Sequence, residues 1–332
     1  MTNSPEVPDG PLVSRRKVLC GMPAAAALPL CAAGEAMADT AAAAPAERLL
    51  THLAVGEIQL SVIPDGPLAQ GDPVKVLQGT DPALIREALR DERLNEAEMT
   101  LDQNAVLLRH GDRLVLVDTG TGGDPLFGPG PGQLMANLRA AGIDPASITD
   151  VLLTHGHPDH LWGLTDLDGV PNLPEAQVHL SEADYRFFSD PAQDSHPKLG
   201  PFMAKCRANL AAVGDRLHMI QDGQEVLAGV VAMAAPGHTP GHSVFLLQSG
   251  DQTLMLGGDL AHHHVIFPRY PDVRFAFDSD PAQMVETRRR YFDMLATDNL
   301  RLLAYHFPFP GAGHLLRSGE AYRWVPQSLD SV

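Results

Sequence analysis

The stretch that decides the fold is Thr154-His155-Gly156-His157-Pro158-Asp159-His160. It places three imidazoles and one carboxylate close together, directly after an apolar run at 151–153 that predicts a short buried strand. Neutral imidazole and carboxylate are good ligands for zinc and similar divalent ions. Two histidines at a strand end can point at one ion, and the Asp159-His160 pair on the following turn can reach a second. Without a metal, a buried imidazole cluster would leave ring nitrogens unpaired, so the stretch predicts a metal site.

Three further candidate ligands lie later in the chain, each just after an apolar segment that predicts a strand. They are His238, Asp259 after the strand at 254–256, and His306 after the strand at 302–305. The edge of a sheet holds side chains rigidly, so these positions can converge with the first four. We interpret His242, close to His238, as a supporting donor or core residue rather than a ligand.

The composition indicates a soluble globular protein. The chain has 332 residues, of which 44% are hydrophobic and 20% charged, as in ordinary soluble domains. Its formal net charge of −17 would repel a polyanion, so nucleic acid is not an expected partner. No clear linker divides residues 49–332, which predicts one domain there.

Residues 1–38 have the pattern of an export signal. Arg15, Arg16 and Lys17 precede an apolar run to about Cys31, and Ala36-Met37-Ala38 is a small-x-small cleavage signal. Paired arginines are typical of twin-arginine signals. An ordinary secretory signal and an uncleaved anchor are the alternatives. We expect cleavage after Ala38, a flexible leader at 39–48, and a periplasmic or secreted protein with no stable membrane anchor.

Only Cys206 of the three cysteines would remain after cleavage, so no internal disulfide is expected. No reactive motif surrounds Cys206, and we interpret it as a packing residue.

The hydrophobic patterns predict strands and helices in both halves of the chain. Strands are expected at 58–63, 105–109, 113–117, 151–154, 176–180, 226–234, 243–248, 253–256 and 302–305. Helices are expected at 82–90, 133–141, 182–188, 201–213 and 281–295. This mixture favours two sheets that face each other with helices outside.

The order His-x-His-x-Asp-His, then a later His, Asp and His, resembles the metallo-β-lactamase superfamily over about residues 50–330. The resemblance implies an α/β fold, the four-layer αββα sandwich, with the site at one sheet edge. It implies two divalent ions per chain, zinc first, with manganese, cobalt or iron as alternatives. Asp118 would support the site from behind. The implied ligands are His155, His157 and His238 for one ion, Asp159, His160 and His306 for the other, and Asp259 as the bridge.

Such a pair of ions can share a water and lower its pKa toward ~7, giving a hydroxide that attacks an ester or lactone carbonyl. Asp159 and Asp259 are the expected catalytic carboxylates. Aspartate rather than cysteine at 259 disfavours a penicillinase, and His157 in place of a glutamate disfavours flavodiiron redox chemistry.

Within the superfamily, the chain most resembles the methyl parathion hydrolase group and its lactonase and arylesterase relatives. The segments that carry this resemblance include 154–160, 238–242, 278–280 and 306–314. The group has an aromatic wall around the substrate, which Phe127 and Phe202 match, with Tyr185 or Phe187 near a third position. The group often forms homodimers and extends to organophosphate triesters.

His262-His263-His264 departs from this group, which is aliphatic there. We assign His262 to the substrate pocket and expect at least two of the three histidines to lie in a solvated loop. A mononuclear iron sulfur dioxygenase of the same fold and a non-catalytic metal-binding relative are the competing interpretations.

Overall fold

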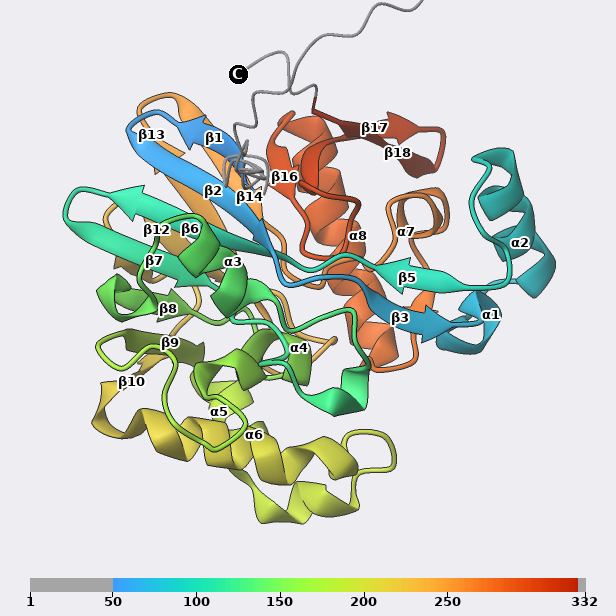
Figure 1. Ribbon diagram of the computed structural model, residues 1–332. Helices are drawn as coiled ribbons and strands as arrows, with labels where there is room; N and C mark the ends of the chain where they lie inside the picture. Colours follow the sequence, from blue (N-terminus) through green and yellow to red (C-terminus); the bar gives the residue numbers. More distant parts are fainter. Residues whose placement is uncertain (1–49, 328–332) are drawn as a thin grey trace, which may run out of the picture. The chain divides into compact units, whose positions relative to one another are not determined.

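Two seven-stranded sheets organise residues 50–327, the part of the chain that the computed structural model describes (Figure 1). The first sheet has the order β1-β2-β6-β7-β8-β9-β10. Its strands are β1 (Thr51–Val55), β2 (Ile58–Pro64), β6 (Asn104–His110), β7 (Arg113–Val117), β8 (Asp150–Leu152), β9 (Gln177–Ser181) and β10 (Leu217–Ile220). The predicted signal at 1–38 and leader at 39–48 lie outside the described residues.

The second sheet has the order β11-β12-β13-β14-β16-β17-β18. Its strands are β11 (Glu225–Leu227), β12 (Val230–Ala234), β13 (Ser243–Ser249), β14 (Gln252–Leu256), β16 (Arg301–Leu303), β17 (Ala312–Ser318) and β18 (Ala321–Pro326). Two small ribbons add β3 (Leu68–Gly71) with β5 (Met99–Leu101), and β4 (Leu77–Gln78) with β15 (Arg274–Phe275).

Four of the described helices pack on the outer faces of the two sheets (Figure 1). α3 (Leu134–Ala140), α5 (Glu182–Ser189) and α6 (Gly200–Val213) pack on the first sheet, and α8 (Pro281–Thr297) packs on the second. The remaining helices are α1 (Pro73–Val76), α2 (Pro82–Asp91), α4 (Pro158–Leu161) and α7 (Ile266–Arg269).

The alternation of side chains along the strands explains these layers. In β6, Val106 and Leu108 join the core between the sheets, while Leu107 joins the core under the outer helices. In β13, Phe245 faces the other sheet and Val244 faces the second helical layer. Strands with two apolar faces need cover on both sides, so the four-layer αββα prediction is confirmed.

The predicted strand at 226–234 is wrong as a single element. It is the hairpin of β11 and β12, which turns at Gly229. Gly229 has a φ of 71°, and a Cβ there would lie 2.4 Å from the carbonyl oxygen of Gln248. The backbone therefore requires glycine at this turn. No prediction covered eight of the described strands: β1, β3, β4, β5, β10, β15, β17 and β18.

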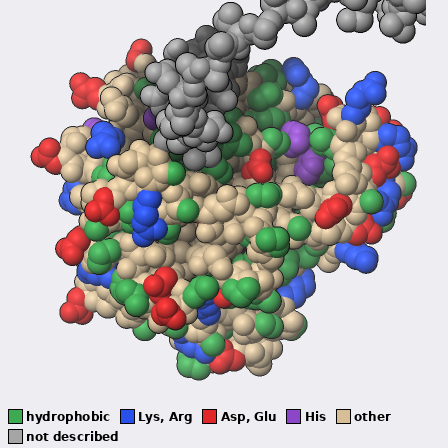
Figure 2. All heavy atoms as spheres, in the orientation of Figure 1, with side chains coloured by type: hydrophobic (Ala, Val, Ile, Leu, Met, Phe, Trp, Pro, Cys, Tyr) green, Lys and Arg blue, Asp and Glu red, His purple; other side chains and the backbone are tan. Residues whose placement is uncertain are grey.

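On the face seen in Figure 2, acidic and basic side chains are interspersed rather than gathered by sign. Within residues 50–327, no helix has both the length and the apolar character needed to cross a membrane.

Candidate metal centre

The candidate ligands follow strands that run in the same direction. β7, β8 and β9 are parallel neighbours, as are β14 and β16. β12 also runs with β14, because both pair antiparallel with β13. Residues that follow these strands therefore meet at one edge of the sandwich. His155 follows β8, His238 follows β12, Asp259 follows β14 and His306 follows β16.

Asp118, at the end of β7, fixes the start of the histidine stretch. Its Oδ1 accepts a hydrogen bond of 2.8 Å from the Thr154 backbone N–H. Its Oδ2 accepts from the Thr154 hydroxyl and from Nδ1–H of His160, both at 2.8 Å. Asp118 thus supports the site from behind, as the sequence predicts. Pro158 at the first position of α4 has the φ that a helix needs, and α4 presents Asp159 and His160.

The first group of donor atoms comes from three histidines and Asp259. Nδ1 of His157 lies 3.0 Å from Nε2 of His155 and 2.9 Å from Nε2 of His238. Oδ2 of Asp259 lies 3.0 Å from Nε2 of His238 and 3.7 Å from Nε2 of His155. Ligands about 2.0–2.2 Å from a tetrahedral ion lie about 3.3–3.6 Å apart, so these donors need shift by only a few tenths of an ångström to hold one small cation.

The second group joins Asp159, His160 and His306 around the same shared carboxylate. Oδ2 of Asp159 lies 3.6 Å from Nε2 of His160 and 3.4 Å from Nε2 of His306. Asp259 Oδ1 lies 3.3 Å from Nε2 of His160, and Asp259 Oδ2 lies 3.3 Å from Nε2 of His306. Asp259 therefore touches both groups, as a bridging ligand must.

The outer nitrogens of four histidines donate to oxygen atoms, which turns their inner nitrogens toward the centre as lone pairs. Because the Thr154 hydroxyl donates to Asp118, Nδ1–H of His155 donates to that hydroxyl (3.0 Å). His238 donates to Asp278 and His306 to the backbone oxygen of Asp102, each at 2.9 Å. The fourth is His160, which donates to Asp118.

Three buried atoms of the candidate ligands, His157 Nε2, His160 Nε2 and Asp259 Oδ1, have no hydrogen-bond partner among the described residues. Bound divalent metal ions would accept the lone pairs of His160 Nε2, Asp259 Oδ1 and the other converging ligand atoms. The set of ligand atoms therefore fits such ions.

Burial and charge set the protonation of the metal-free centre. Burial, with neighbouring imidazoles, lowers the pKa of His155 and His157 well below the usual value, so both are neutral. Burial opposes ionisation of Asp259, but the surrounding imidazoles outweigh it and hold its pKa well below the usual range. Burial likewise opposes the charged form of His238, but hydrogen bonds to Asp259 and Asp278 raise its pKa to about 9.

His242 is buried beside the centre but points away from its donor atoms. Its Nδ1–H donates to the Ala235 oxygen, and its Nε2 accepts from the Asp259 backbone N–H at 3.0 Å. His242 therefore positions the shared carboxylate as a supporting residue.

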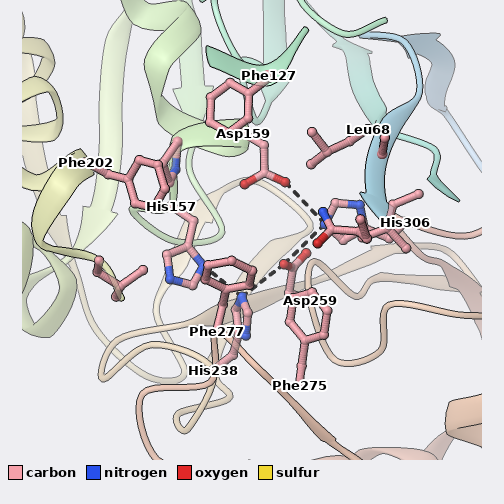
Figure 3. Close-up of a pocket in the computed structure, with 15 residues that line it drawn as sticks. Leu68, Phe127, His157, Asp159, Phe202, His238, Asp259, Phe275, Phe277 and His306 are labelled. Carbon is pink, nitrogen blue, oxygen red and sulfur yellow. Dashed lines mark hydrogen bonds and ion pairs between the residues drawn. The ribbon is translucent and has the colours of Figure 1, made fainter. Parts of the chain in front are cut away.

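A cavity of about 200 Å³ opens onto the centre (Figure 3). Leu68, Phe127, Phe202, Phe275 and Phe277 surround the carboxylate of Asp159 and the rings of His157 and His306 in this view. Phe127 stacks on Phe202 with ring centroids 6.3 Å apart. The predicted aromatic wall at Phe127 and Phe202 therefore exists beside the candidate metal centre.

Two other predicted pocket residues lie elsewhere. Tyr185 and Phe187 of α5 do not line this cavity but pack against the core under the first sheet. Phe275 and Phe277 line the cavity instead. The sequence analysis did not predict either of them. The neighbouring segment 278–280, which carries the family resemblance, could have pointed to them. Asp278 accepts hydrogen bonds from both His238 and the backbone N–H of Phe275.

The solvated-loop prediction for the three histidines is wrong. His262 and His263 are buried, and His264 is partly buried. His262 lies behind the cavity rather than in its wall: its Nε2 is 3.1 Å from Asp259 Oδ2, and its ring stacks on Phe275 at 3.8 Å. His263 accepts the N–H groups of Val265 and Ile266, which open α7. Local composition could not reveal these tertiary contacts.

Comparison with known proteins defines the class. The family model of the metallo-β-lactamase superfamily matches residues 100–306. The chain therefore belongs to this superfamily of metal-dependent hydrolases.

The individual relatives and solved structures share only about a quarter of their aligned residues with this chain. A probable metallo-hydrolase of Mycobacterium tuberculosis is 26% identical over 235 residues, which cover 63% of this chain and 69% of that protein. Among solved structures, the dizinc quorum-quenching lactonase AidC, in complex with a product, has a TM-score of 0.79 at 27% identity. The hydrolase AbOPH of the β-lactamase superfamily has a TM-score of 0.77 at 27% identity. Each comparison covers 84% of this chain and 97% of the other.

Proposed function

We propose that this protein is a binuclear metal-dependent hydrolase of ester or lactone bonds, with activity that extends to organophosphate triesters. One observation carries the proposal: two groups of metal donors share Asp259 at the base of an aromatic-walled cavity. The similarity to a dizinc quorum-quenching lactonase supports lactone hydrolysis, and the similarity to the hydrolase AbOPH supports hydrolysis in general. The resemblance to the methyl parathion hydrolase group supports the extension to organophosphate triesters.

The metal ligands in this proposal are His155, His157, His238, Asp159, His160, His306 and the bridging Asp259, and zinc is the first candidate metal. Bound divalent ions would supply a hydroxide nucleophile near neutral pH and polarise the substrate oxygen. The side chain of Asp159 is 15% exposed and lines the cavity. Its Oδ1, the oxygen outside the donor group, can accept a proton during the reaction. The phenylalanines hold the apolar part of the substrate and exclude water.

The cavity favours an uncharged substrate. Among its lining residues there is no lysine or arginine, and Gln70 is the one polar side chain outside the candidate ligands. Away from the candidate ligands, a free carboxylate or phosphate on the substrate would find no cationic side chain in the lining to pair with. Neutral esters, lactones and phosphotriesters therefore suit it better than charged ones.

The competing sulfur dioxygenase would need one iron. The complete second group of Asp159, His160 and His306 argues for a second metal and disfavours that alternative. It also disfavours a purely structural site, which closes four ligands round one ion.

The test is metal-coupled turnover. The purified protein is stripped of metal, reloaded with zinc, and assayed against phenyl acetate, a lactone and a phosphotriester while metal is quantified. Asp259→Ala should lose metal and turnover together. Asp251→Ala, on the exposed turn between β13 and β14, is the matched control. Full activity in the stripped sample, or one iron with oxygen consumption, would contradict the proposal.

We also propose export by a twin-arginine signal with cleavage after Ala38, on the motif at 14–38. N-terminal sequencing of exported protein should begin at Asp39. An exported chain that begins at Met1 would reject cleavage.

A further inference from the structure

We propose that Asp65 is a specificity-determining positioning residue, because its carboxylate clamps two walls of the substrate cavity together. This inference rests on the proposed hydrolase function. Asp65 follows β2 and is 1% exposed. It is outside the candidate ligands and has no hydrogen bond to any of them.

The carboxylate closes both ends of the loop at 121–134. Oδ2 accepts from the backbone N–H and hydroxyl of Thr121, at 3.0 and 3.1 Å. It also accepts from the N–H of Gly132 at 2.9 Å, and Oδ1 accepts from the N–H of Leu134 at 2.9 Å. Four hydrogen bonds to one buried carboxylate are strong because the acceptor is charged. Gly120 leaves room for this contact, since a Cβ there would lie 2.4 Å from Cγ of Asp65.

The clamped loop carries one wall of the cavity. Phe127 lies on it and contacts Phe202 and Trp162, with its ring centroid 5.5 Å from that of Trp162. The backbone of Asp65 leads directly into a second wall, the segment at 68–70. The N–H of Gln133 donates to the Asp65 carbonyl oxygen at 2.8 Å, which adds a backbone tie between the two segments.

The other anchor of the loop is weaker. Near its tip, Lys205 Nζ lies 2.6 Å from Asp124 Oδ2, but these side chains are 27% and 20% exposed. Solvent screens this partly exposed ion pair more than it screens the fully buried Asp65 carboxylate. The Asp65 clamp is therefore the stronger of the two anchors and sets the position of Phe127.

Asparagine at 65 has the shape of aspartate but presents an NH2 group to at least one of these donors. Loosening the clamp should move Phe127 without removing any candidate ligand. The kcat/KM for substrates that contact the aromatic wall should then fall, while the kcat/KM for small aliphatic substrates should not.

The catalytic test compares dihydrocoumarin with δ-valerolactone, which share the six-membered lactone ring and differ in the fused aromatic ring. In zinc-loaded Asp65→Asn we expect kcat/KM for dihydrocoumarin to fall about three- to tenfold relative to δ-valerolactone, mainly through KM. Phe127→Leu should give the same change, and the double variant should be non-additive. Asp166→Asn is the control, because the partly buried Asp166 also accepts backbone N–H groups, from Asp168 and Val170, but none from the loop at 121–134. Thr121→Val removes only one of the four bonds and serves if Asp65→Asn fails to fold.

A readout that needs no substrate separates this inference from the proposed function. Trp162 and Trp324 are the two tryptophans, so a Trp324→Phe background reports Trp162 alone. Acrylamide quenching of the buried Trp162 should increase in Asp65→Asn and stay unchanged in Asp166→Asn.

Unchanged quenching, or an equal loss of kcat/KM on both lactones, would overturn the role of Asp65. Hydrolysis of neither lactone by the zinc-loaded wild type would instead overturn the lactonase proposal, while quenching would still decide whether Asp65 holds the loop.

Discussion

A single buried carboxylate, Asp184 of α5, joins the loops that carry the first group of candidate ligands. Its Oδ2 accepts from the N–H of Gly156 and the hydroxyl of Thr239, both at 2.8 Å. Its Oδ1 accepts from the N–H of Gly241 at 2.6 Å. Gly156 lies between two candidate ligands, and Thr239 follows a third, so Asp184 fixes their relative positions.

Asp184→Asn should therefore lower both stability and metal content. The amide would leave at least one buried donor unpaired, which costs about 1–3 kcal/mol. Urea unfolding and metal analysis check this result. Asp190→Asn, at an exposed cap that accepts the N–H of Ala192, is the control. Wild-type stability and metal content in Asp184→Asn would contradict the role given to Asp184.

The same carboxyl predicts a pH dependence of stability. Burial raises the pKa of Asp184 from 3.8 to about 6, although its hydrogen bonds oppose the shift. The folded protein thus holds this proton more tightly than the unfolded chain, so its stabilising contribution is full below pH 3.8 and is lost by about pH 6.

Between these limits, the stability of the metal-free wild type should fall relative to metal-free Asp184→Asn by on the order of 3 kcal/mol. Urea unfolding at several pH values measures the difference. A difference that is constant or rises with pH would contradict the assignment.

At the scale of elements, α8 holds the segment between β14 and β15, which contains α7, through one buried cation. The Arg288 guanidinium is fully buried and donates to the carbonyl oxygens of Leu260, Pro271 and Val273. This segment begins beside Asp259 and ends at the aromatic wall of Phe275. Burial lowers the pKa of Arg288 to about 10, which leaves it charged at neutral pH.

Arg288→Lys should destabilise the fold by about 3–5 kcal/mol, because an ammonium group cannot reproduce the planar fork that reaches three carbonyls. The neighbouring Arg289 pairs with Asp272 on the surface, where the two side chains are 44% and 59% exposed. Arg289→Lys is therefore the matched control and should change stability by less than about 0.5 kcal/mol. Equal urea midpoints for the two variants would show that α8 does not depend on this cation.

At the scale of the whole molecule, the candidate metal centre joins the two sheets. His155 follows β8 of the first sheet, whereas His238, Asp259 and His306 follow strands of the second. Ions bound at these residues would connect the sheets at one edge. Binding that needs the folded arrangement stabilises the folded state by mass action.

Removal of metal should consequently lower the Tm, and zinc should restore it. Free zinc at about 1,000 times its Kd should add about 4 kcal/mol per site. Calcium, which prefers oxygen ligands, is the control cation and should restore little. A Tm that does not respond to zinc would argue against metal bound between the sheets.

Much of the architecture could be predicted because its signals are local. Continuous apolar runs predict the strands at 105–109 and 243–248, and β6 and β13 confirm them; both strands are buried on both faces. The hairpin of β11 and β12 was missed because Gly229 interrupts one apolar run without a second turn residue beside it. The burial of His262 was missed because it depends on a stacking partner, Phe275, that follows in a separate segment.

The sequence by itself determined the chemistry of the donors and their order after strands, because side-chain type and hydrophobic period are properties of short segments. Only the tertiary structure decided which aromatic rings form the cavity and which buried carboxylates hold its loops. Those contacts join residues far apart in the chain, as when Asp65 meets Leu134. They form only after the sheets and helices have docked, and no local pattern encodes that docking.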